Sequence, residues 1–227
     1  MSQNGEIILR NVGLSYGKEI IYENFNAVFP QGVNVILGRS GSGKTTLLNI
    51  ISGLISYSGE CVSDKAAVVF SEPALAPVSV ENNVRMVLKK ADCNAVDEAL
   101  KLARIEDKRK QNALTLSDGE KQRVSLARAF ASKRNVLLLD EPFARLDYGV
   151  KRRLHDTLID YLQTSAATVV MVTHDVDEAL TLADRIYFLD GRPCCLTETA
   201  SLSAPPSKRD IYVAEYEVLR KKVLNLF

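Results

Sequence analysis

The segment Gly38-Arg39-Ser40-Gly41-Ser42-Gly43-Lys44-Thr45 constrains the fold of this 227-residue chain more than any other feature. It matches in full the glycine-rich pattern that cradles phosphate groups. An apolar run at 33–37 precedes it, and residues 44–53 follow with helical periodicity. Glycines let successive backbone amides face one anion, and a helix N-terminus adds a favourable dipole. The pattern predicts a strand–loop–helix unit in which Lys44 reaches the phosphates of a nucleotide and the Thr45 hydroxyl binds Mg²⁺.

Apolar runs elsewhere predict the sheet to which this loop belongs. Residues 66–70, 136–139 and 168–172 are continuously apolar, and residues 186–189 form a further candidate strand. Such runs are typical of strands that helices cover on both faces of a parallel sheet. We therefore expect an α/β fold.

Two hairpins are also predicted. Residues 6–16 and 20–29 alternate like an antiparallel pair joined by a turn near Gly17. Asp190-Gly191 predicts a turn into a last strand at 193–197.

Between residues 72 and 131 the pattern becomes helical. Helical periodicity occurs at about 80–89, 96–102 and 120–131, and a last helix is predicted at about 210–226. We therefore predict a single domain, 1–227, composed of an α/β core at 1–71 and 132–200, a helical lobe at 72–131, and a C-terminal linker and helix at 201–227.

Two acids follow the apolar run 136–139. Asp140 suits a Mg²⁺-linked position because hard cations take oxygen ligands, and Glu141 suits a general base that polarises the attacking water. A strand that simply ends in polar residues is the alternative. His174 follows another such run and either contacts the γ-phosphate or has a structural role; His155 lies in a charged helical stretch and is expected to be solvated.

Composition excludes several classes. Lys and Arg number 29 against 28 Asp and Glu, which leaves a net charge of +1. A protein with so small a net charge is not expected to coat a nucleic acid or an anionic membrane. No apolar run approaches the roughly 18 residues of a membrane helix, and the N-terminus has no signal-peptide pattern. The four cysteines lack zinc or disulfide spacing, so Cys194 and Cys195 are predicted to be reduced strand residues of a cytosolic protein.

Several segments together resemble the ATPase subunit of ABC transporters. The resemblance rests on the Walker A loop at Gly38, a Walker B strand that ends Asp140-Glu141-Pro142, the signature-like Leu116-Ser117-Asp118-Gly119-Glu120, a D-loop-like 144–147, and His174 as switch histidine. It covers about residues 5–200 and implies a P-loop NTPase (RecA-like) core with a parallel sheet, an N-terminal antiparallel β part and an inserted helical lobe.

The resemblance also implies roles for the candidate residues. ATP would be bound by Tyr16, stacked on adenine, by residues 38–45 with Thr46, and, across a head-to-tail dimer, by Ser117 and Gly119 of a second subunit. Mg²⁺ would be bound by Thr45, Asp140 and Ser71, and catalysis would use Glu141, His174 and Lys44. For Tyr16, a place in the core is the alternative.

Further segments are similar to importers of the nitrate, sulfonate and taurine group. They are 69–77, 81–84, 173–185 and Gly191-Arg192-Pro193. This similarity implies an integral membrane permease as a separate chain, an extracytoplasmic solute-binding protein that acts indirectly, and a second ATPase subunit, identical or different, with no nucleic-acid partner. It also implies a peripheral location on the cytoplasmic face of the cell membrane.

The sequence departs from the family at three positions. Ser71 stands where the family has glutamine, Asp118 where it has a second glycine, and Glu120 where it has glutamine. A carboxylate 4 Å from a phosphate charge costs roughly 1 kcal/mol in water. Asp118 either weakens the ATP-bound dimer in this way or points to solvent and caps the helix. We therefore expect that the subunit hydrolyses ATP slowly, or only when it is docked to its permease.

Two other functions stay open on the sequence alone. A nucleotide-gated assembly protein would bind ATP and dimerise with negligible turnover, which Ser71 and Asp118 favour and the Asp140-Glu141 pair opposes. A soluble ABC ATPase of DNA repair or translation is opposed by the lack of a long coiled-coil insertion or a tandem cassette. The sequence does not identify the solute.

Overall fold

The computed structural model describes residues 5–88, 92–144 and 146–227, which fall into two units. The first unit contains the described residues of Met1–Ala66, Asn135–Asp140 and Ala167–Phe227, and the second contains those of Ala67–Arg134 and Glu141–Ala166. The helical lobe expected at 72–131 lies inside the second unit. The units are described one at a time.

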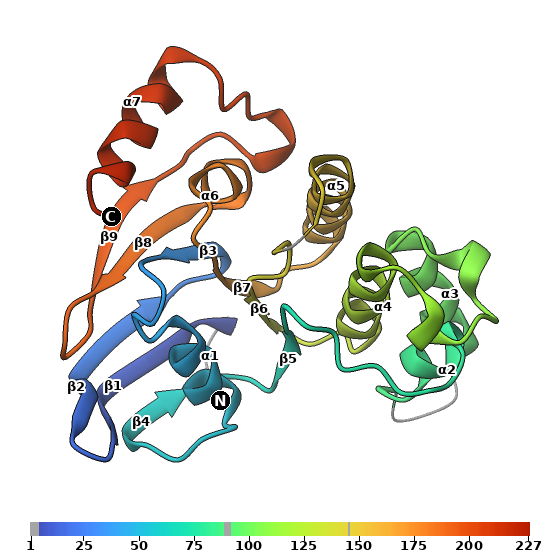
Figure 1. Ribbon diagram of the computed structural model, residues 1–227, viewed down its shortest axis with the longest axis horizontal. Helices are drawn as coiled ribbons and strands as arrows, with labels where there is room; N and C mark the ends of the chain where they lie inside the picture. The colour runs from blue at the N-terminus through green and yellow to red at the C-terminus, as the bar shows by residue number, and fades with distance from the viewer. Residues whose placement is uncertain (1–4, 89–91, 145) are drawn as a thin grey trace. The chain divides into compact units, whose positions relative to one another are not determined.

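An antiparallel sheet forms the N-terminal part of the first unit. Strands β1 (Ile7–Tyr16), β2 (Glu19–Phe29) and β4 (Ser58–Val62) lie in the order β2-β1-β4 (Figure 1). The hairpin between β1 and β2 turns at Gly17, whose φ of 60° suits glycine. The predicted antiparallel pair is confirmed.

A second, mostly parallel sheet lies in the same unit. Its strands in this unit follow the order β6 (Val136–Asp140), β7 (Thr168–Val172), β3 (Gly32–Leu37), β8 (Arg185–Asp190) and β9 (Cys195–Ser201). All but β9 run parallel, and β9 pairs with β8 in the antiparallel sense. Every residue of β6 and β7 is buried, which explains why these strands are apolar without alternation.

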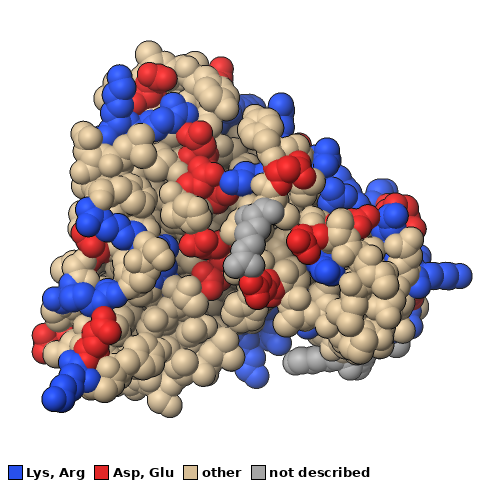
Figure 2. All heavy atoms as spheres, viewed as in Figure 1, with Lys and Arg blue, Asp and Glu red and all other residues tan. Residues whose placement is uncertain are grey.

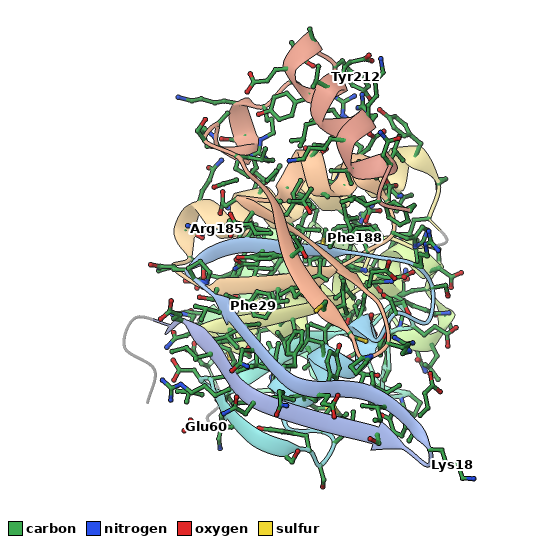
Figure 3. All side chains as sticks on the ribbon, turned by 90° about the vertical axis from the view of Figure 1, so that its left-hand side faces the viewer. Lys18, Phe29, Glu60, Arg185, Phe188 and Tyr212 are labelled. Carbon is green, nitrogen blue, oxygen red and sulfur yellow. The ribbon has the colours of Figure 1, made fainter. Side chains whose placement is uncertain are left out.

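Helices α1 (Lys44–Ser52), α6 (Val176–Leu182) and α7 (Ala214–Leu224) belong to this unit, with a short 3₁₀ turn at Pro206–Lys208. The last helix begins four residues later than the sequence predicted, because the Asp210 side chain accepts a hydrogen bond from the Tyr212 amide and forms a turn instead. The chain end returns to the sheet, where the Phe227 ring lies 5.2 Å from that of Phe188 on β8. Figure 3 labels Phe188 on this strand.

The second unit is mainly helical. Strand β5 (Ala66–Val69) leads into it, and its helices are α2 (Val80–Arg85), α3 (Cys93–Leu102), α4 (Asp118–Ala131) and α5 (Tyr148–Thr164), with 3₁₀ turns at Glu106–Lys108 and Ala113–Thr115. Phe130 of α4 stacks on Tyr161 of α5 with ring centroids 4.1 Å apart. Helix α2 ends at Arg85, earlier than the predicted residue 89, which lies outside the described residues.

The surface carries mixed charge. Figure 2 shows Lys and Arg interspersed with Asp and Glu on the face it displays, in keeping with the net charge of +1. Across the described parts of the chain, the helices are all too short or too polar to span a bilayer.

Candidate functional site

The phosphate loop connects β3 to α1 within the first unit. Gly38 follows the last residue of β3 directly, and a Cβ there would lie 2.4 Å from the Leu189 carbonyl oxygen. Gly43, directly before α1, has a φ of 92°, and a Cβ there would lie 3.0 Å from the Tyr22 hydroxyl. Both positions therefore require glycine, which explains the pattern in the sequence.

Lys44 is held across this loop. Its side chain is buried, with the residue 6% exposed, and Nζ donates hydrogen bonds to the carbonyl oxygens of Gly38 (2.7 Å) and Arg39 (2.8 Å). A buried ammonium beside a helix N-terminus creates a strong site for an anion. The neighbouring Ser42 hydroxyl is buried and has no hydrogen-bond partner among the described residues, so it is a donor available to a phosphate oxygen.

The Thr45 hydroxyl and the Asp140 carboxylate meet beside the loop. Thr45 Oγ1 donates to Asp140 Oδ1 at 3.1 Å, which joins the first turn of α1 to the end of β6. Asp140 is 8% exposed. A hydroxyl and a carboxylate are the oxygen donors that Mg²⁺ takes, so these residues fit that ion.

Parallel strands bring His174 to the same edge of the sheet. Ile36 of β3 and Asp140 of β6 are both in register with Val172 of β7, two residues before His174. The Thr173 amide donates to the Ile36 carbonyl at 3.2 Å, which fixes the chain just before the histidine. The loop, Asp140 and His174 therefore share the carboxyl ends of neighbouring strands, as ligand sites of such sheets do.

The segment that carries His174 is itself held by a buried acid. Thr173 Oγ1 donates to Glu178 Oε2 at 2.6 Å, and the Asp175 amide donates to Thr173 Oγ1 at 3.1 Å. His174 is exposed at this edge.

Tyr16 ends β1 with its side chain largely in solvent. The residue is 55% exposed, so it is not a core tyrosine. An exposed aromatic ring can stack on a base, which is the role expected for it.

The second unit contains the remaining candidate residues, Ser71, Ser117, Gly119 and Glu141. Ser71 is exposed, just after β5. Glu141 has a φ of 44°, and its carbonyl accepts a hydrogen bond from the Ala144 amide at 3.1 Å. Positive φ is rare outside glycine and concentrates at functional sites.

Ser117 is the N-cap of α4. Its amide and its hydroxyl both donate to Glu120 Oε2, at 2.9 and 2.8 Å. Asp118 points to solvent, as expected, with its side chain 85% exposed, but the expectation that it caps the helix is wrong because Ser117 occupies that position. Gly119 lies so close to α5 that a Cβ would be 2.6 Å from Val150 Cγ1.

Glu120 has a lowered pKa because the Ser117 amide and then its hydroxyl donate to the carboxylate. We expect Glu120→Ala to lower the free energy of unfolding by about 1 kcal/mol at pH 7. A lowered pKa stabilises the fold above the ordinary Glu value of about 4.3, so the difference should shrink as pH falls below it. Urea unfolding at pH 7 and pH 3 measures this. Glu98→Ala, on exposed α3 surface, is the control, and a deficit that stays constant with pH would contradict the prediction.

Two further expectations concern α5 and its start. Asp147 is the N-cap of α5 and accepts from the Val150 amide at 3.0 Å; Arg145 of the D-loop-like segment lies outside the described residues. The expectation that His155 is solvated is wrong, because its Nε2 is buried and its ring packs edge-on against Phe143 at 4.6 Å.

Sequence reasoning missed three side chains that contact the phosphate loop. Tyr22, Arg192 and Cys194 each donate a hydrogen bond to a loop carbonyl. Cys194 was expected in a strand but lies in the turn before β9, and Arg192 was noted only as part of Gly191-Arg192-Pro193.

Comparison with known proteins agrees with this geometry. The family model described as "ABC transporter" matches residues 23–144. An aliphatic sulfonates import ATP-binding protein of Pseudomonas syringae pv. syringae is 41% identical over 225 residues, which cover 96% of this chain and 80% of that protein. Another, of Paracoccus denitrificans, is 36% identical over 229 residues, covering 96% and 92%.

Solved structures share the fold. A putative metal-chelate type ABC transporter in an inward-facing conformation superposes with a TM-score of 0.75 at 23% identity, covering 95% of this chain and 88% of that one. The expected ABC ATPase fold and the expected function in ATP-driven import are confirmed over the two alternatives. The chain belongs to the ABC transporter family, as an ATP-binding and ATP-hydrolysing subunit.

Proposed function

We propose that this chain powers the import of an organic sulfonate by hydrolysing Mg²⁺–ATP beneath a separate membrane permease. The observation that supports the nucleotide chemistry is the meeting of Thr45 and Asp140, 3.1 Å apart, beside a phosphate loop that holds a buried Lys44. The sulfonate is proposed because the similar proteins above are named for sulfonate import.

In this proposal the loop amides, the Lys44 ammonium and the Ser42 hydroxyl bind the phosphates of ATP, and Tyr16 stacks on its adenine. Thr45 and Asp140 hold Mg²⁺, which when bound neutralises phosphate charge. Glu141 orients and polarises the attacking water, and His174 contacts the γ-phosphate. Catalysis by such groups is positioning and electrostatic stabilisation.

A second ATPase subunit completes each site. Ser117 and Gly119 at the N-terminus of α4 face the γ-phosphate that the other subunit binds, in a head-to-tail dimer of identical or different chains. The positive end of the helix dipole at an N-terminus favours an anion. Partners of this assembly are the permease and, through it, an extracytoplasmic solute-binding protein, which places the chain on the cytoplasmic face of the membrane.

The departures at Ser71 and Asp118 are expected to slow the isolated subunit. The Asp118 carboxylate is 85% exposed and lies next to Ser117 and Gly119, so in the proposed dimer it would be close to the nucleotide of the second subunit. The double variant Ser71→Gln/Asp118→Gly should raise turnover about fivefold or more, because removing roughly 1 kcal/mol of repulsion is alone worth about fivefold and a longer polar side chain is restored. A steady-state phosphate-release assay on the purified subunit measures this. Unchanged turnover would mean that both departures are neutral.

The import proposal is tested in membranes and in cells. Tagged protein is purified in mild detergent from its native membranes, and co-purifying chains are identified by mass spectrometry. A multi-span membrane protein at stoichiometric yield supports the proposal, and only soluble partners would overturn it. Growth of a deletion strain on an alkanesulfonate as sole sulfur source, with sulfate as control, tests the solute: a defect confined to the sulfonate, restored by the wild-type chain and not by Glu141→Gln, is expected.

A further inference from the structure

Three consecutive carbonyl oxygens of the phosphate loop accept hydrogen bonds from side chains outside the loop. Arg192 Nη2 donates to Gly41, Cys194 Sγ donates to Ser42 at 3.3 Å, and the Tyr22 hydroxyl donates to Gly43 at 2.9 Å. Tyr22 lies on β2, and the other two lie in the turn between β8 and β9, beside β2 (Figure 1, Figure 3).

The direction of these carbonyls decides what the loop can bind. In a peptide unit the C=O of one residue and the N–H of the next point in opposite directions, so fixing the carbonyls of Ser42 and Gly43 away from the site leaves the amides of Gly43 and Lys44 to face an anion. The Ser42 amide, opposite the Gly41 carbonyl, donates to the Arg39 carbonyl at 3.1 Å and closes the loop. A carbonyl that rotated inward would instead present its negative end to the phosphates. Lys44 Nζ engages the carbonyls of Gly38 and Arg39, so the donors together restrain both halves of the loop.

The outside donors are themselves fixed in place. Arg192 Nε donates to Glu19 Oε1 at 3.1 Å, and its Nη1 donates to Cys194 Sγ at 3.0 Å. The Cys194 amide donates to the Ile21 carbonyl at 2.8 Å, which attaches the turn to β2. A chain of hydrogen bonds therefore connects the Glu19 carboxylate, through the Arg192 guanidinium and the Cys194 thiol, to the Ser42 carbonyl.

Burial keeps the thiol and the phenol in their donor forms. Cys194 is 4% exposed, and burial raises its thiol pKa despite the nearby guanidinium. Burial also raises the pKa of the Tyr22 hydroxyl well above its usual range. Both groups therefore keep their protons at neutral pH and can donate to the loop.

We propose that Tyr22, Arg192 and Cys194, here called the carbonyl clamp, are positioning residues that hold the phosphate loop in its ATP-binding orientation. The clamp acts through the loop backbone. The inference rests on ATP binding by this chain and needs neither the permease nor the sulfonate, so failure of the import proposal would leave it standing.

The test measures nucleotide affinity of the full chain by titration calorimetry with ATP and with ADP. Cys194→Ala should weaken both about fivefold, the worth of one neutral hydrogen bond, and Arg192→Gln should weaken both about tenfold or more because its bonds are charge-assisted. Cys194→Ser keeps a donor and should bind within twofold of the wild type. Because Arg192 donates to the Cys194 sulfur, the double variant should lose less than the product of the single losses.

Matched controls separate the clamp from general effects. Cys195→Ala removes the adjacent exposed thiol, and Arg10→Gln removes an exposed arginine that pairs with Glu60 on the same sheet as β2; both should bind as the wild type does. Thermal unfolding without nucleotide is measured for every variant, and Arg192→Gln, an exposed site, should change the midpoint little.

Two results would overturn the proposal. One is wild-type affinity in both Arg192→Gln and Cys194→Ala. The other is an affinity loss in Cys194→Ala that Cys194→Ser does not reverse, since that would assign the effect to packing of the sulfur.

Discussion

Glu141→Gln is expected to lower the turnover of ATP about 10²- to 10⁴-fold while ATP still binds. The amide keeps the size of the side chain and removes the carboxylate that would accept a proton from water. Glu141 directly follows the buried end of β6 and has a φ of 44°, a conformation that is uncommon outside glycine. Phosphate release and ATP titration on the same preparation measure the two effects separately.

The control for Glu141→Gln is Glu98→Gln on α3, which makes the same chemical change at an exposed side chain 3.6 Å from Lys133. It should leave turnover unchanged. For Glu141→Gln we expect a lower turnover of ATP and an unchanged affinity for ATP. Loss of ATP binding in Glu141→Gln would show that Glu141 supports the site instead of the water, and turnover near the wild type would remove it from the chemistry.

Lys44→Ala is expected to weaken ATP binding about 10- to 150-fold and to lower turnover of bound ATP by a further 10²-fold or more. The variant removes the only part of residue 44 that carries charge, and it frees the carbonyls of Gly38 and Arg39 from Nζ. Titration calorimetry gives the affinity, and single-turnover hydrolysis at saturating ATP gives the rate.

Lys18→Ala is the matched control, because Lys18 lies at the exposed hairpin tip between β1 and β2 (Figure 3). Removing its ammonium should change neither quantity. If Lys44→Ala bound ATP as tightly as the wild type, the buried ammonium would serve to hold the loop carbonyls alone, and the assignment of Lys44 to the phosphates would be rejected.

Sequence patterns predicted those strands and loops in which a single physical cause determines the residue types. The phosphate loop was predictable because Gly38 and Gly43 have no room for a side chain, and the parallel strands because burial on both faces permits only apolar residues. Boundaries were less predictable where side chains compete with the backbone. Asp210 delays α7, and Ser117 rather than Asp118 caps α4, since both serine and aspartate suit that position.

The candidate site divides in the same way. The roles of Lys44, Thr45, Asp140 and Glu141 could be predicted from the sequence, because the members of each pair are adjacent in the chain. Lys44 and Thr45 lie at the start of a helix, and Asp140 and Glu141 lie at the end of a strand. His174 was ambiguous in the sequence until the register of β7 with β3 and β6 placed it at the loop's edge of the sheet. His155 was misjudged because its contact with Phe143 joins residues that no helical period relates.

The sequence by itself determined the α/β fold and the phosphate loop, because glycine geometry and apolar burial act on neighbouring residues, and its resemblance to ABC transporter subunits implied the ATPase activity. Only the tertiary structure decided what holds that loop. Arg192 and Cys194 reach carbonyls about 150 positions earlier in the chain, the separations being 151 and 152 residues. Such contacts depend on which strands pair and where a hairpin ends, and a hydrogen bond to a backbone carbonyl imposes no pattern on the residue that accepts it.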